Sequence, residues 1–385
     1  MSFPNVADRA GVAHHGEPST VRSIFLSSLL ASIAILPSSA STATHQLGLP
    51  TRVVTTDPRG AAITSLGRRL FVDKRLSADG TISCSSCHVP QKAFSDGLPV
   101  ARGIGGILGT RNTPSLWNVA FTTSQFWDGR RISLEQQAAD PLLNPREHGL
   151  PDDRTLLAII RRDNGYQQDF YRAFGVDPEG ITLDRVVAAL ASFERTLVAG
   201  DSPFDRYLYA QDRLALSDAA IRGLELFRGR AKCSTCHTVG EKFALLTDNL
   251  FHTVGVGLRG VEFRLAKSAT QVVSTSRVDL DRLISEDPNI SALGRFVVTK
   301  QPRDIGKFKT PSLRNVALTA PYMHDGTVTT LAETIEVEIY YRGLESNTPL
   351  ILTPQEKRDL LAFLDSLTSP AAARVTPDAD TNPAR

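Results

Sequence analysis

Two copies of one short cysteine motif constrain this chain more than any other feature. They read Cys84-Ser-Ser-Cys87-His88 and Cys233-Ser-Thr-Cys236-His237, and together they use all four cysteines of the 385-residue sequence. In the pattern C-x-x-C-H, the two thiols attach to the vinyl groups of a haem and the histidine binds its iron from the proximal side. A pair of redox or zinc C-x-x-C motifs is the alternative. Two matches that consume every cysteine favour two covalently attached haem c groups.

Further repeats flank these motifs. Gly67 to Phe71 precedes the first motif and Gly223 to Phe227 precedes the second, each resembling the end of a helix that runs toward a haem. Thr113 to Ala120 recurs as Thr310 to Ala317 at a displacement of 197 residues, whereas the cysteine motifs are displaced by 149. Matched spacing of this kind indicates an internal duplication. The difference places a long insertion around residues 255 to 305.

Composition and periodicity predict a helical globular protein. The hydrophobic fraction of 41%, the charged fraction of 22% and the net charge of +2 exclude a disordered chain and a strongly basic nucleic-acid binder. Apolar residues recur at helical spacing within residues 184–198, and Thr353, Pro354 and Glu356 are typical of a capped helix start. We therefore predict an all-α fold of two cytochrome c-like domains, each with one covalently bound c-type haem.

The predicted domain boundaries follow from these landmarks. We expect a leader over residues 1–43, an N-terminal cytochrome c domain over 44–200 and a C-terminal one over 201–368. Residues 369–385 are rich in Pro, Ala, Thr and Asp, which predicts a disordered tail.

The leader has the pattern of an export signal. Arg22 is followed by an apolar run to Leu36, too short for a comfortable membrane span, and then by small residues. Cleavage is expected after Ala40 or Ala43. The stretch before Arg22 is long for such a leader, which leaves a misassigned start or an uncleaved anchor as alternatives.

The motifs together resemble those of bacterial dihaem cytochrome c peroxidases and their MauG-like relatives. Besides both C-x-x-C-H motifs, the resemblance rests on Arg111-Asn-Thr-Pro-Ser-Leu, Gln125-Phe-Trp-Asp-Gly-Arg130, Asn144-Pro-Arg-Glu147 and Pro321-Tyr-Met-His-Asp-Gly326. It covers roughly residues 60 to 368. It implies a bacterial, periplasmic enzyme whose N-terminal haem reacts with peroxide and whose C-terminal haem handles electrons.

The resemblance assigns roles to individual residues. His88 and His237 match the proximal iron ligands. Glu147 matches the distal acid, which moves a proton between the peroxide oxygens, and Gln137 matches the distal glutamine. Trp127 matches the tryptophan between the haems, an electron bridge or simply a buried core aromatic.

The resemblance also implies a calcium ion between the domains. Asn112 would supply a side-chain oxygen, and Thr319 and Pro321 would supply backbone carbonyls. Water would complete the shell, as calcium accepts.

Two departures from the family pattern concern the sixth iron ligands. Many of these peroxidases carry a blocking histidine in the loop before the Arg-Asn-Thr-Pro motif, but residues 101–110 contain none. We therefore expect an open, five-coordinate N-terminal haem that needs no reductive activation, with His148 as an alternative ligand. The usual distal methionine of the other haem is also missing, and Glu338 stands at its position by count.

A segment with two tyrosines offers a replacement for that methionine. Tyr340-Tyr-Arg-Gly343 resembles the tyrosine-containing segment of MauG-like proteins after a two-residue shift. Tyr340 is the first choice as axial ligand of the C-terminal haem iron, with Tyr341 and Met323 as alternatives. A tyrosinate ligand would lower the reduction potential of that haem, whereas a thioether would raise it.

The resemblance implies reduction of hydrogen peroxide to water, with electrons from a small cytochrome c or cupredoxin. Two alternatives remain: MauG-like oxidation of a partner protein, and a non-enzymatic dihaem electron carrier. MauG uses a surface tryptophan just before its second haem motif, and Gly229-Arg-Ala-Lys232 has none. The resemblance leaves room for a homodimer and gives no role to nucleic acid.

Overall fold

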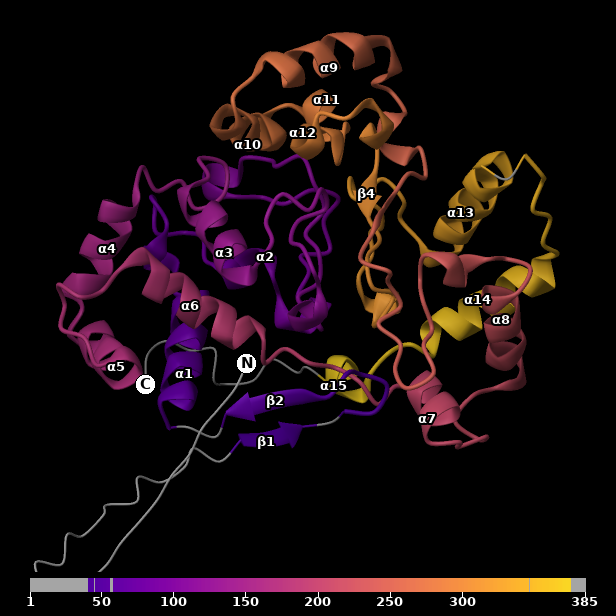
Figure 1. The fold of residues 1–385 in the computed structure, drawn as a ribbon, viewed down its shortest axis with the longest axis horizontal. Coiled ribbons are helices and arrows are strands. Elements are labelled where there is room, and N and C mark those ends of the chain that lie inside the picture. The colour runs from indigo at the N-terminus through magenta and orange to yellow at the C-terminus, as the bar shows by residue number, and fades with distance from the viewer. Residues whose placement is uncertain (1–40, 45, 56–57, 346, 375–385) are drawn as a thin grey trace, which may run out of the picture. The chain divides into compact units, whose positions relative to one another are not determined.

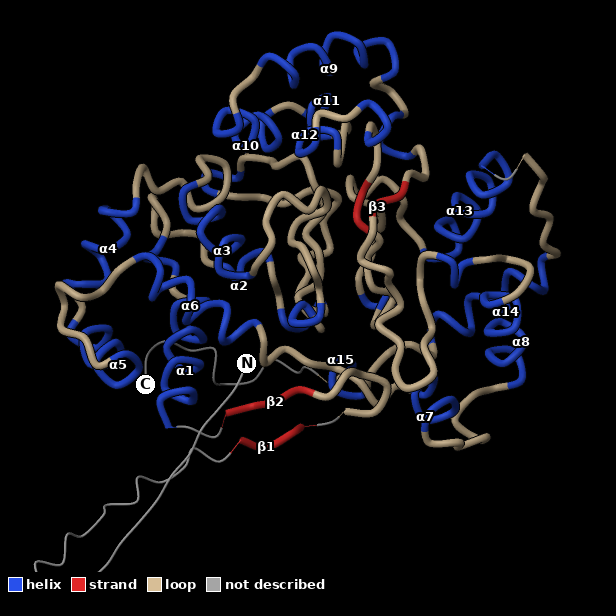
Figure 2. The backbone as a smooth tube through the Cα atoms, viewed as in Figure 1, coloured by secondary structure: helices blue, strands red, loops and turns tan. Residues whose placement is uncertain are grey.

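The computed structural model describes residues 41–44, 46–55, 58–345 and 347–374. This part of the chain is mostly helical with very little strand (Figures 1 and 2), which confirms the predicted all-α class. Of the predicted leader, residues 1–40 lie outside the described residues. Among the described residues, no helix combines the length and the apolar character that crossing a membrane requires.

The helices fall into three groups along the chain. The first group is α1 (Pro58–Val72), α2 (Cys84–Cys87), α3 (Leu134–Leu143), α4 (Asp153–Arg162), α5 (Asn164–Phe174) and α6 (Leu183–Glu194). The second is α9 (Leu265–Ser274), α10 (Arg277–Glu286), α11 (Pro288–Ser291) and α12 (Phe296–Thr299). The third is α7 (Pro203–Tyr209), α8 (Asp218–Arg228), α13 (Leu331–Glu345), α14 (Pro354–Asp365) and α15 (Pro370–Ala373).

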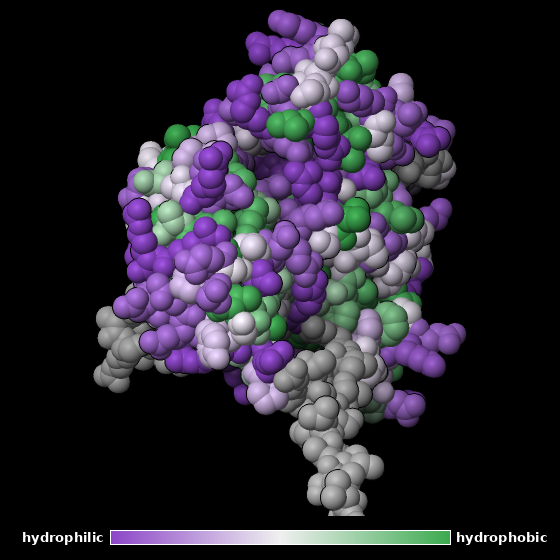
Figure 3. Space-filling model, turned by 60° about the vertical axis from the view of Figure 1, so that its left-hand side comes forward, coloured by the Kyte–Doolittle hydropathy of each residue, from purple (hydrophilic) through white to green (hydrophobic). Residues whose placement is uncertain are grey.

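Each group has its own hydrophobic core. The first is centred on residues such as Phe71, Tyr166 and Phe170, and the third on Phe204, Phe227 and Phe363. The face of the molecule in Figure 3 is mostly hydrophilic, with hydrophobic residues in small scattered groups. Burial of apolar surface inside these cores is the main source of stability.

The repeated glycines explain how the first and third groups are built. A Cβ atom at Gly67 of α1 would collide with the backbone carbonyl of Ala189 in α6. A Cβ atom at Gly223 of α8 would collide in the same way with the carbonyl of Asp359 in α14. Each glycine therefore allows two helices to cross at close range. The predicted capping box of α14 is confirmed, because the Thr353 side chain accepts from Glu356 N and the Glu356 side chain accepts from Thr353 N.

The second repeat forms a matching pair of loops. Asn118 and Asn315 both have φ of 63°, a left-handed conformation that asparagine tolerates. The side-chain oxygen of Asn118 accepts from Ala199 N at 2.9 Å, and that of Asn315 accepts from Ser369 N at 2.8 Å. Each asparagine thus joins its loop to the segment that follows the last long helix of its half.

The predicted insertion contains α9 to α12. It packs around Leu280, Ile290 and Phe296, and Figure 1 shows it above the loops that lie between the other two groups. It also contacts the first half directly, because Thr110 Oγ1 donates to Ile284 O at 2.6 Å.

Two parts of the fold differ from expectation. Residues 369–374 are not a disordered tail, because Ser369 caps α15 with its side chain and donates from Oγ to Gly200 O. Residues 375–385 lie outside the described part. Two small antiparallel sheets also occur, β1 (Ser41–Thr44) with β2 (Arg52–Thr55) and β3 (Phe251–His252) with β4 (Phe308–Lys309). Strands this short leave too little alternation to be seen in a sequence.

Candidate functional site

A large cavity is lined by both cysteine motifs. Its walls include Cys84, Cys87 and His88 from the first motif and Cys233, Cys236 and His237 from the second. No disulfide joins these four cysteines, which all lie in the described part of the chain. They are therefore available to form thioether bonds.

Both motif histidines are oriented as iron ligands. His88 Nδ1 lies 2.9 Å from the carbonyl oxygen of Phe94, and His237 Nδ1 lies 3.0 Å from that of Leu246. A carbonyl only accepts, so Nδ1 carries the proton and Nε2 keeps a lone pair for a metal. Burial lowers the pKa of both histidines, to about 4 for His237, which keeps the rings neutral.

The local structure around the two motifs is nearly the same. His88 N donates to Cys84 O at 2.9 Å, and His237 N donates to Cys233 O at 3.0 Å. The rings of Phe71 and Phe227, at the ends of α1 and α8, each lie 6.5 Å from the ring of the following motif histidine. The repeated Gly-to-Phe segment thus ends against the histidine that it precedes.

An orphaned polar atom supports the fit of a cofactor with hydrogen-bond acceptors. Trp117 lines the cavity, and its buried Nε1–H has no partner among the described residues. Haem propionates are acceptors of the kind that this donor lacks. Together with free thiols and correctly oriented imidazoles, this donor set fits two haem c groups.

The two proposed distal residues, Gln137 and Glu147, both line the cavity. Gln137 and Pro141 are four residues apart on α3, so they share a face of the helix. The chain then turns at Asn144, and the next turn brings Glu147 to the same cavity. Asn144 Nδ2 donates to Glu147 Oε1 at 2.6 Å and fixes the carboxyl group.

The environment of Glu147 favours a carboxyl group that holds its proton more readily than usual. Burial raises the pKa of Glu147, the positive charge of Arg130 lowers it and the negative charge of Asp140 raises it. The net shift is upward. A carboxyl group in reach of a substrate can accept a proton and return it, as a general base and then a general acid.

Hydrogen bonds join the loop of residues 101–110 to the segment that carries Glu147. Ile104 N donates to Glu147 O at 3.0 Å, and the Arg146 guanidinium donates to Leu108 O at 2.9 Å. The loop residues that line the cavity are Ala101, Gly103, Gly109 and Thr110. None of these carries an imidazole, thioether, amine or carboxylate.

His148, the alternative ligand, is tied to the protein by a hydrogen bond. The residue is 3% exposed, and its Nδ1 lies 2.8 Å from Leu76 O. It also lines the cavity.

Trp127 contacts both halves of the duplication. Its Nε1 donates to Asn112 O at 2.9 Å, and its carbonyl accepts from Lys309 N at 2.7 Å. Its ring lies edge-on to that of His324, with 6.5 Å between the centroids.

The three expected calcium ligands all line the cavity. Asn112 N donates to His324 O at 2.8 Å, which brings the first half next to the segment that follows Thr319 and Pro321. Asn112 Nδ2 donates to Leu98 O at 2.9 Å, so the amide oxygen points away from that carbonyl.

The structure does not bring Tyr340 to the cavity. Tyr340 is 57% exposed and is absent from the cavity wall, because the face of α13 that lines it carries Ile335, Glu338 and Arg342. Tyr341 also lies elsewhere, where its hydroxyl accepts from Arg259 Nε at 2.7 Å. Met323, the third candidate, does line the cavity. Tyr340 stands two residues after Glu338. Residues two apart on a helix lie on different faces, so Tyr340 does not share the cavity-lining face of α13.

Sequence reasoning missed two parts of the site. Glu194 ends α6, lines the cavity at 5% exposure and has one carboxyl oxygen without a described partner. Ile284 and Ser285 of the insertion line the same cavity as Glu147. Arg130 also lines the cavity, and it is the one residue among these without a predicted role that stands inside a family motif, Gln125 to Arg130.

Comparisons with known proteins agree with this geometry. Residues 61–213 match the family model described as di-haem cytochrome c peroxidase. The methylamine utilization protein MauG of Methylorubrum extorquens is 36% identical over 81% of this chain and 80% of its own. The cytochrome-c peroxidase IdrP1 of a Pseudomonas species is 35% identical over 89% of this chain and 91% of its own. The crystal structure of a MauG-like protein associated with microbial copper homeostasis matches with a TM-score of 0.66 and 35% identity, over 82% and 91% of the two chains.

Proposed function

The chain belongs to the di-haem cytochrome c peroxidase family, and on that premise we propose that it reduces hydrogen peroxide to water. It is an oxidoreductase of the cytochrome-c peroxidase type. The reaction consumes two electrons and two protons for each peroxide. The observation that carries the proposal is the position of Glu147 on the same cavity as the first cysteine motif.

The two cysteine motifs would each hold one haem c. Cys84, Cys87 and His88 would bind the peroxide-reacting haem, and Cys233, Cys236 and His237 the electron-transferring one. When bound, the haem irons supply the redox chemistry. The hydrogen bonds from Nδ1 of each histidine to a carbonyl set the tautomer that this binding needs.

Glu147 would manage the protons. Its carboxylate would take a proton from the peroxide oxygen nearer the iron and return it to the leaving oxygen, so that water departs. Asn144 holds the acid in place at 2.6 Å, and Gln137 borders the same space. Trp127, in contact with both halves, would carry electrons between the haem sites.

The arrangement of residues 101–110 supports an enzyme that is active without prior reduction. The loop is bonded to the backbone of Glu147, and no strong iron ligand of this loop reaches the cavity. A site that starts open binds peroxide directly. The electron donor would be a small periplasmic cytochrome c or cupredoxin, consistent with an exported enzyme.

A calcium ion would join the two halves through Asn112, Thr319 and Pro321. The proposal rests on the common place of these three residues at the cavity. Oxygen donors with water in the remaining positions suit this cation.

The sixth ligand of the C-terminal haem iron would come from Glu338 or Met323 rather than Tyr340. Both line the cavity, whereas Tyr340 points to solvent. Glu338 also occupies the position at which the family places its ligand by count.

The MauG-like alternative is favoured by the 35% identity to the MauG-like crystal structure. In that case the chain would oxidise residues of a partner protein. The absence of tryptophan between Gly229 and Lys232 counts against the exit route that MauG uses.

Peroxide-dependent oxidation of a reduced donor tests the proposal. The fully oxidised holoprotein is mixed with hydrogen peroxide and a reduced small cytochrome c or cupredoxin, and two donors are expected to be oxidised per peroxide from the first turnover. A lag that disappears after pre-reduction would overturn the open resting site. Failure of every small donor, with oxidation of a partner protein instead, would favour the MauG-like activity.

A further inference from the structure

The three residues that would bind calcium each have a counterpart in the other copy of the duplication. The counterparts follow from the displacement of 197 residues that relates Thr113 to Thr310 and continues without a gap to Asp128 and Asp325. They pair Asn112 with Lys309, Thr319 with Thr122 and Pro321 with Ser124. The chain therefore contains a second place whose residues correspond one by one to the proposed calcium site.

The structure gives these corresponding loops the same local shape. Phe126 and Met323, which are counterparts, both have a left-handed φ, of 65° and 71°. Thr122 and Thr319 both donate from Oγ1 to the backbone carbonyl three residues earlier, at 2.7 Å and 3.1 Å. The correspondence is therefore one of conformation as well as of sequence.

The two halves also contact each other through counterpart residues. Asn112 N donates to His324 O at 2.8 Å, and Lys309 N donates to Trp127 O at 2.7 Å. His324 and Trp127 are separated by the same 197 residues, and so are Asn112 and Lys309. The same backbone contact is thus made twice between the halves, once in each direction.

The side chain at the end of this contact differs between the two places. The first place has the amide of Asn112, whereas the second has the ammonium group of Lys309, whose Nζ donates to Ser124 O at 2.5 Å. Ser124 O is the counterpart of the Pro321 carbonyl that would bind calcium. At the second place, the protein's own positive charge therefore already contacts the backbone oxygen of the opposite half.

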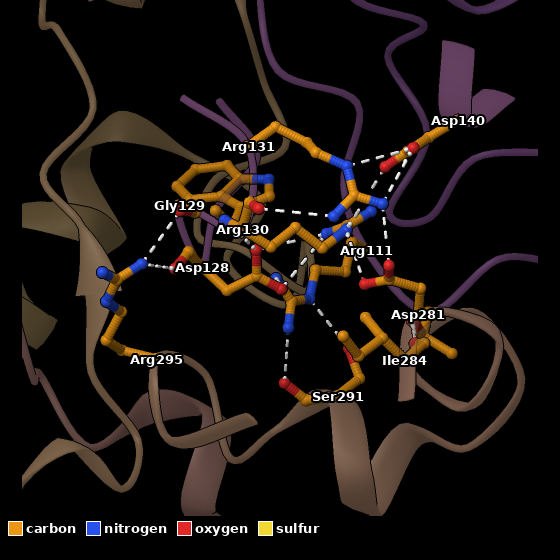
Figure 4. A network of polar contacts seen from close by, with 12 residues as sticks. Arg111, Asp128, Gly129, Arg130, Arg131, Asp140, Asp281, Ile284, Ser291 and Arg295 are labelled. Atoms are coloured by element: carbon orange, nitrogen blue, oxygen red, sulfur yellow. Dashed lines mark hydrogen bonds and ion pairs between the residues drawn. The ribbon is translucent and has the colours of Figure 1, made fainter. Parts of the chain in front are cut away.

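Lys309 is not held there by an ion pair. Within the described part of the chain its ammonium group, which is partly buried and lines the cavity, bonds to a carbonyl and to no carboxylate. The acid that acts on it is Asp128, whose carboxylate is instead bound by Arg111 and Arg130, each at 3.1 Å (Figure 4). Burial lowers the pKa of Lys309 to about 8, so the charged form predominates at pH 7. A cation that binds a neutral carbonyl oxygen is what a calcium ion would be at the first place.

We propose that the Lys309 ammonium group is a built-in counterpart of the calcium ion: it binds the Ser124 carbonyl of the opposite half and clamps the contact between the halves without a metal. This inference deepens the proposed calcium site and rests on it. It assigns a latent cation site to Lys309, Thr122 and Ser124, which an oxygen ligand in place of the amine would open to calcium.

Substitution of the lysine by the residue of the calcium site tests this assignment. Lys309→Asn removes the tethered charge and supplies the amide that Asn112 has. Calcium per chain is measured by elemental analysis of the holoprotein after dialysis against calcium chloride, and the thermal unfolding midpoint is measured in calcium and in EGTA. We expect Lys309→Asn to bind about one calcium ion more per chain than the wild type. Its midpoint should be lower than that of the wild type in EGTA and should recover in calcium.

The reverse substitution should make calcium dispensable at the first place. Asn112→Lys brings an amine to the Pro321 carbonyl, so this variant should lose the bound calcium ion. Its unfolding midpoint should be the same in EGTA and in calcium.

Two further variants serve as controls. Lys242→Asn changes an exposed lysine of the same half and should leave calcium content and midpoint as in the wild type. Lys309→Met supplies neither a charge nor an oxygen ligand, so it should lower the midpoint in both solutions and bind no additional calcium.

The outcomes separate this inference from the proposals on which it rests. If the wild type binds calcium but Lys309→Asn binds no more than the wild type, Lys309 is not a counterpart of the ion and the calcium site stands. If Lys309→Asn fails to fold, Asn112→Lys decides, because a midpoint that still falls in EGTA overturns the inference. If the wild type binds no calcium, the calcium site and this inference are both wrong, while the donor assay still tests peroxide reduction.

Discussion

The Asn144 side chain donates a hydrogen bond of 2.6 Å to Oε1 of Glu147. This contact orients a carboxyl group whose pKa burial has raised, and it does so at the wall of the cavity. An oriented acid that holds its proton more readily than usual is suited to the proposed proton transfer between the two peroxide oxygens.

Replacing this acid should therefore stop peroxide turnover. We expect Glu147→Gln to lower the rate about 10²- to 10⁴-fold, because an amide cannot relay the proton. Both haems should remain attached, as judged from the pyridine haemochrome spectrum. Glu179→Gln, an exposed carboxyl on the same half, serves as control. Normal turnover in Glu147→Gln would remove the proposed acid.

The C-terminal haem should respond to Glu338 and not to Tyr340. Tyr340 is 57% exposed, whereas Glu338 lines the cavity. We expect Tyr340→Phe to leave the low-temperature electron paramagnetic resonance spectrum unchanged, and Glu338→Gln to alter the signal of one haem. An unchanged spectrum in Glu338→Gln would leave Met323, tested by Met323→Leu, as the candidate. A changed spectrum in Tyr340→Phe would restore the original assignment.

Glu194 should make the protein less stable as the pH rises. Burial raises the pKa of Glu194 to about 8, above an ordinary value of 4.5, so the folded state holds a proton that the unfolded chain releases. Its contribution to stability is complete below pH 4.5 and is lost as the pH rises toward 8. The slope is at most about 1.4 kcal/mol per pH unit.

Chemical denaturation of wild type and Glu194→Gln at several pH values checks this. The variant lacks the titrating group, so its free energy of unfolding should fall less between pH 5 and 8. Parallel curves would mean that Glu194 is already ionised in the folded protein.

A bound calcium ion should stabilise the contact between the two halves. Chelation with EGTA is expected to lower the thermal unfolding midpoint of the holoprotein, and added calcium should restore it. A ligand present at 100 times its Kd contributes about 2.7 kcal/mol. Asn112→Ala should lose most of this response. If EGTA leaves the midpoint of the wild type unchanged, the calcium proposal fails.

Short sequence motifs predicted those features of the protein that depend only on residues close together in the sequence. The C-x-x-C-H motifs and the capping box of Thr353 and Glu356 each depend on residues that are close in the sequence, so their spacing can be read directly. The duplication also indicated which distant segments correspond. Asn118 and Asn315 occupy matching positions in the repeat, and each side chain accepts a hydrogen bond from the segment after the last long helix of its half.

Contacts across long stretches of sequence could not be predicted in this way. The Arg131 guanidinium donates a hydrogen bond to Asp281, which lies 150 residues further along the chain. No motif near either residue indicates that the two are partners. Which face of α13 lines the cavity is hard to predict for a related reason. A register error of two residues exchanges a cavity-lining side chain for an exposed one, and only the packing of the whole helix decides between them.

The wall that α10 contributes means that the first half is not a self-sufficient module. A fragment ending at Gly200 would keep its thiols, its proximal imidazole and Glu147, but would lose Ile284, Ser285 and the carboxylate of Asp281. A change in the insertion would therefore alter the border of a cavity that both cysteine motifs line.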